Sequence, residues 1–73
     1  MSYNGYANYE TWNVALWLQN DELLYMMAAM FAEHGYKSLS YLLKEGSPTT
    51  NDGVAWDNPK LDIDELNEML MEL

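Results

Sequence analysis

The stretch of residues 8–21 constrains the fold of this 73-residue chain more than any other. Asn8 has the short polar side chain of an N-cap residue, which accepts a hydrogen bond from an otherwise unpaired amide in the first turn of a helix. We therefore predict a helix that begins near Tyr9. From residue 12 to residue 18 every residue except Asn13 is apolar. The helix is thus hydrophobic around most of its circumference, a pattern typical of a buried central helix.

This central position sets expectations for the core. We expect the other elements to surround the first helix, with Trp12, Leu16 and Trp17 among the most buried residues. Replacing Trp12 by alanine would then lower the free energy of unfolding by about 3–5 kcal/mol. A single core in a chain of this length supplies only about 3–5 kcal/mol in total, so the substitution would unfold the domain.

A second helix is predicted from Glu22 to His34. Asp21 is its expected N-cap, and Gly35 is expected to end it in a left-handed conformation. The short connection between the two helices predicts a helix hairpin.

A third helix of about two turns is predicted after Ser38, its expected N-cap, and before Gly46. Residues 46–60 are then rich in turn-forming residues and predict a long loop. Trp56 is expected to anchor this loop in the core, with a short strand near residues 54–56 as an additional element.

The last helix is predicted from Ile63 to about Glu72. Asp62 and Glu65 have the spacing of a capping box, in which the two side chains satisfy amide groups at the helix start. The fold class predicted for residues 1–73 is therefore mainly α: a single small compact bundle of three to four helices with one long anchored loop. Residues 1–7 are expected to form a flexible arm.

The charge balance limits the classes of partner. Twelve acidic residues face three lysines and no arginine, for a formal net charge of −9. Direct binding to nucleic acid is disfavoured, because it depends on lysine and arginine displacing counterions from phosphates. A basic partner protein is favoured instead, and the alternative is an acidic surface that only keeps the protein in solution.

Other features of the chain bear on where it acts. It has no cysteine, and its first residues do not resemble a signal peptide. The longest apolar run, residues 23–32, is too short for the roughly 20 residues that cross a bilayer. We expect no membrane partner and a cytoplasmic location.

Catalytic and metal-binding patterns are weak in this sequence. His34 is the single histidine, and no phosphate-binding loop or nucleophile motif is found. We predict no catalytic residue, no cofactor and a protein that is not an enzyme. The aspartates at positions 52, 57, 62 and 64 do not have the spacing of a calcium-binding loop, so no metal site is predicted.

The acidic flank of the last helix is the predicted partner-binding site. Asp64, Glu68 and Glu72 follow one another at intervals of four residues, about 6 Å along a helix, and Glu65 lies beside them. Like charges at this spacing destabilise a helix by a few tenths of a kcal/mol per pair, so stability alone does not favour the pattern. The row of charges is compatible with nucleic-acid mimicry, and the alternative is an ordinary solvated face.

The abundance of apolar residues predicts a second kind of surface. The first and second helices are apolar nearly all round, and a domain of only four short helices can hardly cover both of them. We therefore expect a symmetric homodimer that buries part of the first and second helices. The alternative function is accordingly a small structural or regulatory interaction module that binds through its apolar and aromatic surface.

The stretch Asn-Tyr-Glu-Thr-Trp-Asn-Val-Ala-Leu-Trp-Leu-Gln-Asn-Asp at residues 8–21 resembles the signature of a family of small proteins from bacteriophages, plasmids and bacteria. Weaker similarity is found at residues 52–54, Trp56, residues 59–62 and residues 66–70. Because most members of that family have no assigned activity, the resemblance implies a mobile-element setting rather than a chemistry. In that setting, small acidic proteins often block host enzymes or defence systems. Together with the negative charge and the acidic flank of the last helix, the resemblance predicts a phage- or mobile-element-encoded, non-enzymatic binding protein that engages and inhibits a host protein that handles nucleic acid.

Overall fold

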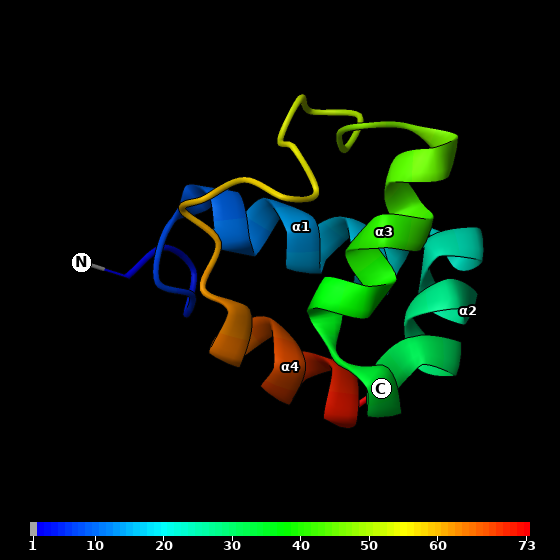
Figure 1. Cartoon of the computed structure of the whole chain (residues 1–73). Helices are drawn as coiled ribbons and strands as arrows, with labels where there is room; N and C mark the ends of the chain where they lie inside the picture. The colour runs from blue at the N-terminus through cyan, green and yellow to red at the C-terminus, as the bar shows by residue number, and fades with distance from the viewer. Residues whose placement is uncertain (1) are drawn as a thin grey trace.

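The computed structural model describes residues 2–73, and Met1, the first residue of the predicted arm, lies outside the described residues. Four α-helices and one 3-10 helix follow one another along this part of the chain and pack into a body of 30 × 24 × 20 Å. Helix α1 spans Tyr9–Asn20 and packs against α2 and α4 (Figure 1). The predicted mainly α fold is confirmed.

Helix α1 begins as predicted. The side chain of Asn8 accepts a hydrogen bond of 2.8 Å from the backbone amide of Thr11, which satisfies one of the amides that a helix start leaves unpaired. The arm before it contains a turn in which Tyr3 and Tyr6 exchange two backbone hydrogen bonds. Asn4 and Gly5 both have positive φ in this turn, a conformation typical of an Asn-Gly pair.

The prediction that Trp12, Leu16 and Trp17 are among the most buried residues is wrong. Leu16 is 36% exposed, and the two tryptophans are half-buried. Because neighbouring elements cover one side of α1, its fully buried residues follow a helical stripe instead: Thr11, Asn13, Val14, Ala15 and Leu18.

Trp12 lies on the outer side of α1 against two rings. Its ring centroid is 5.1 Å from that of Tyr3 and 5.7 Å from that of Tyr9. These two rings therefore cover Trp12 only in part. The large loss of stability expected for Trp12→Ala was based on full burial of Trp12, which the structure does not show.

Helix α2 spans Glu22–Phe31, and the side chain of Asp21 caps it through the amide of Leu24, as predicted. Its last predicted turn is a separate 3-10 helix, η1, at Ala32–His34. Gly35 ends this turn with a φ of 84°, which glycine adopts readily, although its ψ of 165° lies outside the left-handed helical region.

Helix α3 spans Tyr36–Gly46, so it starts earlier and is longer than predicted, and Ser38 is not its N-cap. The N-cap residue is Gly35, which has no side chain to accept a hydrogen bond. The amide of Tyr36 instead donates a bond of 2.7 Å to the side chain of Asn67 in the last helix. Asn67, which is distant in the sequence, thus accepts from the helix start in place of Ser38, the predicted N-cap residue.

Residues 47–62 form the long connection, which crosses the upper part of the molecule in Figure 1 before it descends to the last helix. Trp56 is only 3% exposed and anchors this segment in the core, as predicted. The hydroxyl of Tyr36 donates a hydrogen bond to the carbonyl of Trp56, and burial raises the pKa of Tyr36 above its ordinary value of 10. The predicted strand is reduced to one bridge between Thr49 and Ala55.

Helix α4 spans Ile63–Met71, and the side chain of Asp62 caps it by accepting from the amide of Glu65. The second half of the predicted capping box does not form. The carboxylate of Glu65 accepts a bond of 2.7 Å from the amide of Ala7, while the amide of Asp62 donates to Thr11. Both groups therefore tie α4 to the N-terminal part of the chain.

Candidate functional site

The polar residues of the 8–21 motif bind the C-terminal half of the chain. The Asn8 side chain donates a bond of 2.6 Å to the carbonyl of Lys60, and the Thr11 hydroxyl accepts one of 2.9 Å from the amide of Asp62. These contacts join the start of α1 to the segment that leads into α4. The motif residues at the helix start are therefore structural.

The same holds further along α1, where the buried side chain of Asn13 sits between two loop residues. Its amide nitrogen donates to the Asp52 carboxylate at 2.8 Å, and its oxygen accepts from the Thr50 hydroxyl at 2.7 Å. The indole of Trp17 donates to the same Asp52 oxygen at 2.8 Å. These hydrogen bonds favour the charged carboxylate and lower the pKa of Asp52 below its ordinary value.

The distinctive motif and its weaker companion around Asp52 are thus two sides of one internal contact. Their polar groups already have partners inside the molecule, and no buried side-chain nitrogen or oxygen among residues 2–73 lacks a hydrogen-bond partner. A binding site for another molecule is better sought among polar groups that lie outside this contact.

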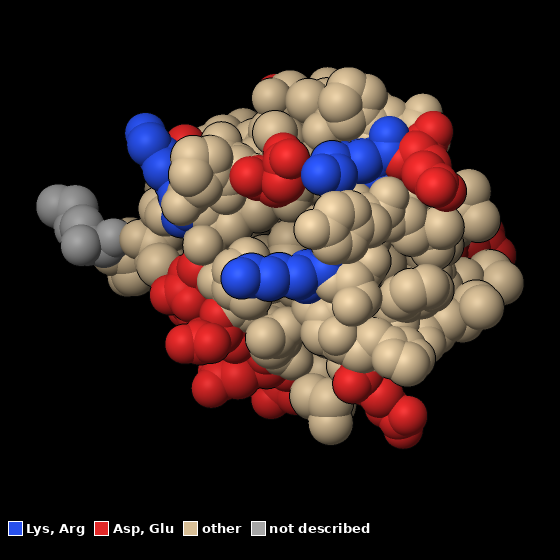
Figure 2. Space-filling view, in the orientation of Figure 1, with Lys and Arg blue, Asp and Glu red and all other residues tan. Residues whose placement is uncertain are grey.

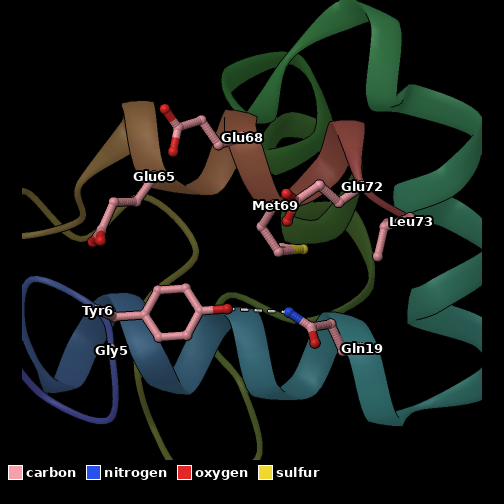
Figure 3. A pocket seen from close by; sticks show the side chains of 8 residues that line it. All are labelled: Gly5, Tyr6, Gln19, Glu65, Glu68, Met69, Glu72 and Leu73. Carbon is pink, nitrogen blue, oxygen red and sulfur yellow. Dashed lines mark hydrogen bonds between the residues drawn. The ribbon is translucent and has the colours of Figure 1, made fainter.

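Such groups line a groove between the N-terminal arm, α1 and α4, which we call the acidic groove. Its volume is about 460 Å³. Figure 3 shows the glutamates of α4 on one side and the Tyr6 ring with Gln19 on the other. The residues that line it are Gly5, Tyr6, Gln19, Glu65, Glu68, Met69, Glu72 and Leu73.

The structure separates the four predicted site residues. Glu65, Glu68 and Glu72 line the acidic groove, whereas Asp64 does not. Glu68 and Glu72 are exposed, while Glu65 is half-buried and already bound to the amide of Ala7. The predicted row through Asp64 is therefore divided, and the groove is lined by the glutamates at positions 65, 68 and 72.

Five residues of the groove were not predicted as site residues from the sequence: Gly5, Tyr6, Gln19, Met69 and Leu73. The hydroxyl of Tyr6 accepts a hydrogen bond of 3.2 Å from the Gln19 amide, which holds the ring along the groove. The Asn4-Gly5 pair is a strong turn signal and could have indicated that the chain reverses before Tyr6. Nothing in the sequence indicates that the turn faces α4.

The groove carries negative charge that no lysine offsets. Its lining contains no lysine or arginine, and within residues 2–73 the ion pair that forms joins Lys44 to Asp57 at 3.2 Å. Figure 2 shows lysines over α3 and the neighbouring loop, while acidic side chains gather at the lower left, toward α4. The charges are thus unevenly distributed over the surface.

Other chemistry finds less support in the geometry. His34 is exposed at the end of η1, with its ring 5.8 Å from that of Phe31. Among residues 2–73, no three histidine, aspartate or glutamate side chains are placed to hold a metal ion together. None of the helices in this part of the chain has the length and apolar character needed to span a membrane.

The fold and the groove define a small, acidic, mainly helical protein with a carboxylate-lined surface. The chain belongs to a family of unknown function, DUF7249, whose model it matches over residues 1–73. No curated protein and no solved structure was found to match it.

Proposed function

We propose that this protein is a non-enzymatic acidic binding protein whose acidic groove receives a basic segment of another protein. The observation that supports this most is the gathering of Glu65, Glu68 and Glu72 along one concave surface with no basic residue in its lining. Carboxylates that lie close together on one surface act jointly on a lysine- or arginine-rich segment, so they attract it more strongly than isolated surface acids do.

The remaining walls of the groove suit the stems of such side chains. Tyr6 offers an aromatic ring, on which a guanidinium can stack, and Met69 and Leu73 add apolar surface. Long basic side chains commonly bury their methylene groups on surfaces of this kind while their charge reaches an acid. A lysine- or arginine-rich segment is thus the partner chemistry that the groove favours.

The class of protein that exposes such segments is one that handles nucleic acid, because phosphate binding depends on clustered lysine and arginine. Our proposal is therefore that the groove binds the basic, nucleic-acid-binding surface of a host protein in competition with nucleic acid. As a partial mimic of nucleic acid, the groove would inhibit that host protein. A phage or other mobile-element origin and action in the host cytoplasm belong to the same proposal. They rest on the charge and on the resemblance of the 8–21 motif.

A pair of matched double variants tests the role of the groove. Glu68→Gln with Glu72→Gln removes two carboxylates from the groove, whereas Asp64→Asn with Glu45→Gln removes two exposed carboxylates outside it. Binding of an arginine-rich peptide is measured by calorimetry at low and moderate salt. We expect the groove variant to weaken binding about tenfold and to flatten its salt dependence, and the control variant to change binding by about twofold or less. Equal losses in both variants would mean that only net charge matters and would overturn the groove as the site.

The identity of the partner requires capture from host lysate with the tagged protein. A basic nucleic-acid-binding protein that is retained by the control variant, lost with the groove variant and released by salt supports the proposal. Capture that is insensitive to both salt and the groove variant would instead favour a module that binds through its apolar surface.

A further inference from the structure

The outer edge of α2 exposes large apolar side chains that the domain does not cover. Leu23 is 65% exposed, Met26 56% and Met30 74%. Tyr25 is also among the exposed large apolar residues, and Ala29 lies exposed between the methionines. Contiguous apolar side chains of this size on a soluble domain typically mark a contact surface.

The spacing of these residues is that of a helix that packs on another helix. Leu23, Met26 and Met30 follow one another at intervals of three and four residues, so they form a single straight row on a helix ten residues long. The small Ala29 beside this row allows a second helix to approach closely. No charged residue lies between Glu22 and Glu33. In Figure 1, α2 lies along the right-hand edge, and in Figure 2 that side is largely tan.

We propose that the outer edge of α2 binds the same edge of a second copy of this chain, in a symmetric dimer. An isologous contact needs a self-complementary surface, and an uncharged apolar row meets this requirement. Two chains that each carry a formal charge of −9 repel one another across most orientations. Between the exposed Glu22 and Glu33 at its two ends, the outer edge of α2 carries no charge, so two copies can meet along this row with few opposing carboxylates.

Two other occupants fit this surface less well. A basic protein segment would find no carboxylate along the row from Leu23 to Met30. A lipid surface is favoured by lysine and arginine beside the apolar row, since most cellular membranes are anionic, and α2 has neither residue. The acidic groove and the α2 edge therefore serve different partners.

The size of the surface limits the area that a dimer contact through α2 can bury. Helix α2 is about 15 Å long and about 10 Å wide, and a standard interface buries roughly 800 Å² on each partner. That amount is about a sixth of the 4634 Å² surface of the chain and is more than one face of a helix of this size offers. We therefore expect a transient dimer, with a dissociation constant of about 100 μM, rather than a permanent one.

Sedimentation equilibrium from about 5 μM to about 1 mM, in moderate salt, tests the proposal across this range. The wild type is expected to pass from the mass of one chain toward that of two. Met26→Glu is expected to raise the dissociation constant at least about tenfold, because it places like charges at the centre of the contact. Met71→Glu is the matched control, since Met71 is a 69% exposed methionine at the end of α4, and it is expected to leave the dissociation constant nearly unchanged.

Thermal melting of both variants confirms that they are folded, which is expected because both side chains are largely exposed. A mass of one chain at every concentration would overturn the proposal. A dimer that Met26→Glu leaves intact would overturn the assignment to α2. A monomer that cosediments with neutral lipid vesicles through Met26 would show that the edge binds lipid instead.

Discussion

Helices α1 and α4 both carry polar side chains along much of their length, yet the two sets have different surroundings. On α1, Asn13 and Trp17 hold residues of the loop that follows α3. On α4, Glu68 and Glu72 are exposed and make no side-chain hydrogen bond or ion pair within residues 2–73. A polar residue with an internal partner serves folding, whereas one that faces a groove is available to another molecule.

The largest effect is expected where the internal contact is broken. Asn13→Ala leaves the buried hydroxyl of Thr50 without its acceptor and removes one donor from Asp52. We expect a loss of about 2–3 kcal/mol in the free energy of unfolding, because buried polar groups without partners retain their full desolvation cost. Urea unfolding followed by tryptophan fluorescence measures it.

The control for this substitution lies on the same helix. Asn20→Ala removes an exposed amide that bonds only to the carbonyl of Leu16 within its own helix. We expect a change within about 0.5 kcal/mol. If Asn13→Ala were no more destabilising than this control, the polar residues of α1 would not be structural, and the contrast with α4 would fail.

A smaller effect is expected from the pH dependence of the same contact. Hydrogen bonds from Asn13 and Trp17 lower the pKa of Asp52 in the folded protein, relative to an ordinary value of 3.8. A lowered pKa contributes stability that is fully present above the ordinary value and is lost as the pH falls through the folded value. Asp52 thus contributes above about pH 4 and ceases to contribute in stronger acid.

Asp52→Asn isolates this contribution from those of the other carboxylates. We expect the wild type to melt at a higher temperature than the variant at pH 7, and the difference to shrink as the pH is lowered below about 4. Melting curves of both proteins across this range provide the measurement. A difference that stays constant with pH would show that the charge of Asp52 is not what holds the loop.

The sequence predicted the features whose causes are local. Asn8, Asp21 and Asp62 each cap a helix through an amide three residues ahead, so the signal lies within one turn. The burial of Trp56 was predicted because a large aromatic ring in a polar, turn-rich segment gains most by packing into the core.

Features that depend on distant residues were missed. The start of α3 depends on Asn67, which lies 31 residues from Tyr36, and the side chain of Glu65 is bound by Ala7 at a separation of 58 residues. The burial of α1 was overestimated for a similar reason. Hydrophobic residues all round a helix do not show which side its neighbours cover.

The acidic groove was predicted only in part, because intervals of four residues along a helix identify a flank but not what lies opposite. The spacing grouped Asp64 with Glu68 and Glu72, whereas the arm and Gln19 make the groove with Glu65, Glu68 and Glu72. The side of α4 that forms the groove is therefore set by tertiary structure.

The smallest expected effect concerns the stability of the groove itself. Glu68 and Glu72 are one helical turn apart, and Glu72 is the C-cap residue of α4, at the negative end of the helix dipole. The variant with Glu68→Gln and Glu72→Gln should therefore be more stable than the wild type, by about 0.2–0.5 kcal/mol for each unfavourable interaction that it removes.

Asp64→Asn provides the contrast on the same helix. Asp64 lies in the first turn of α4, where a negative charge interacts favourably with the helix dipole. Asp64→Asn removes the repulsion between Asp64 and Glu68, but it also removes this favourable interaction, and the two effects offset one another. We expect its stability to be unchanged or slightly lower. Urea unfolding of the three proteins at low salt, where surface charges are least screened, measures both changes. A groove variant that is clearly less stable than the wild type would mean that these glutamates serve folding, as the polar residues of α1 do. Partner binding and the free energy of unfolding would then both decrease in this variant, instead of binding weakening while stability rises.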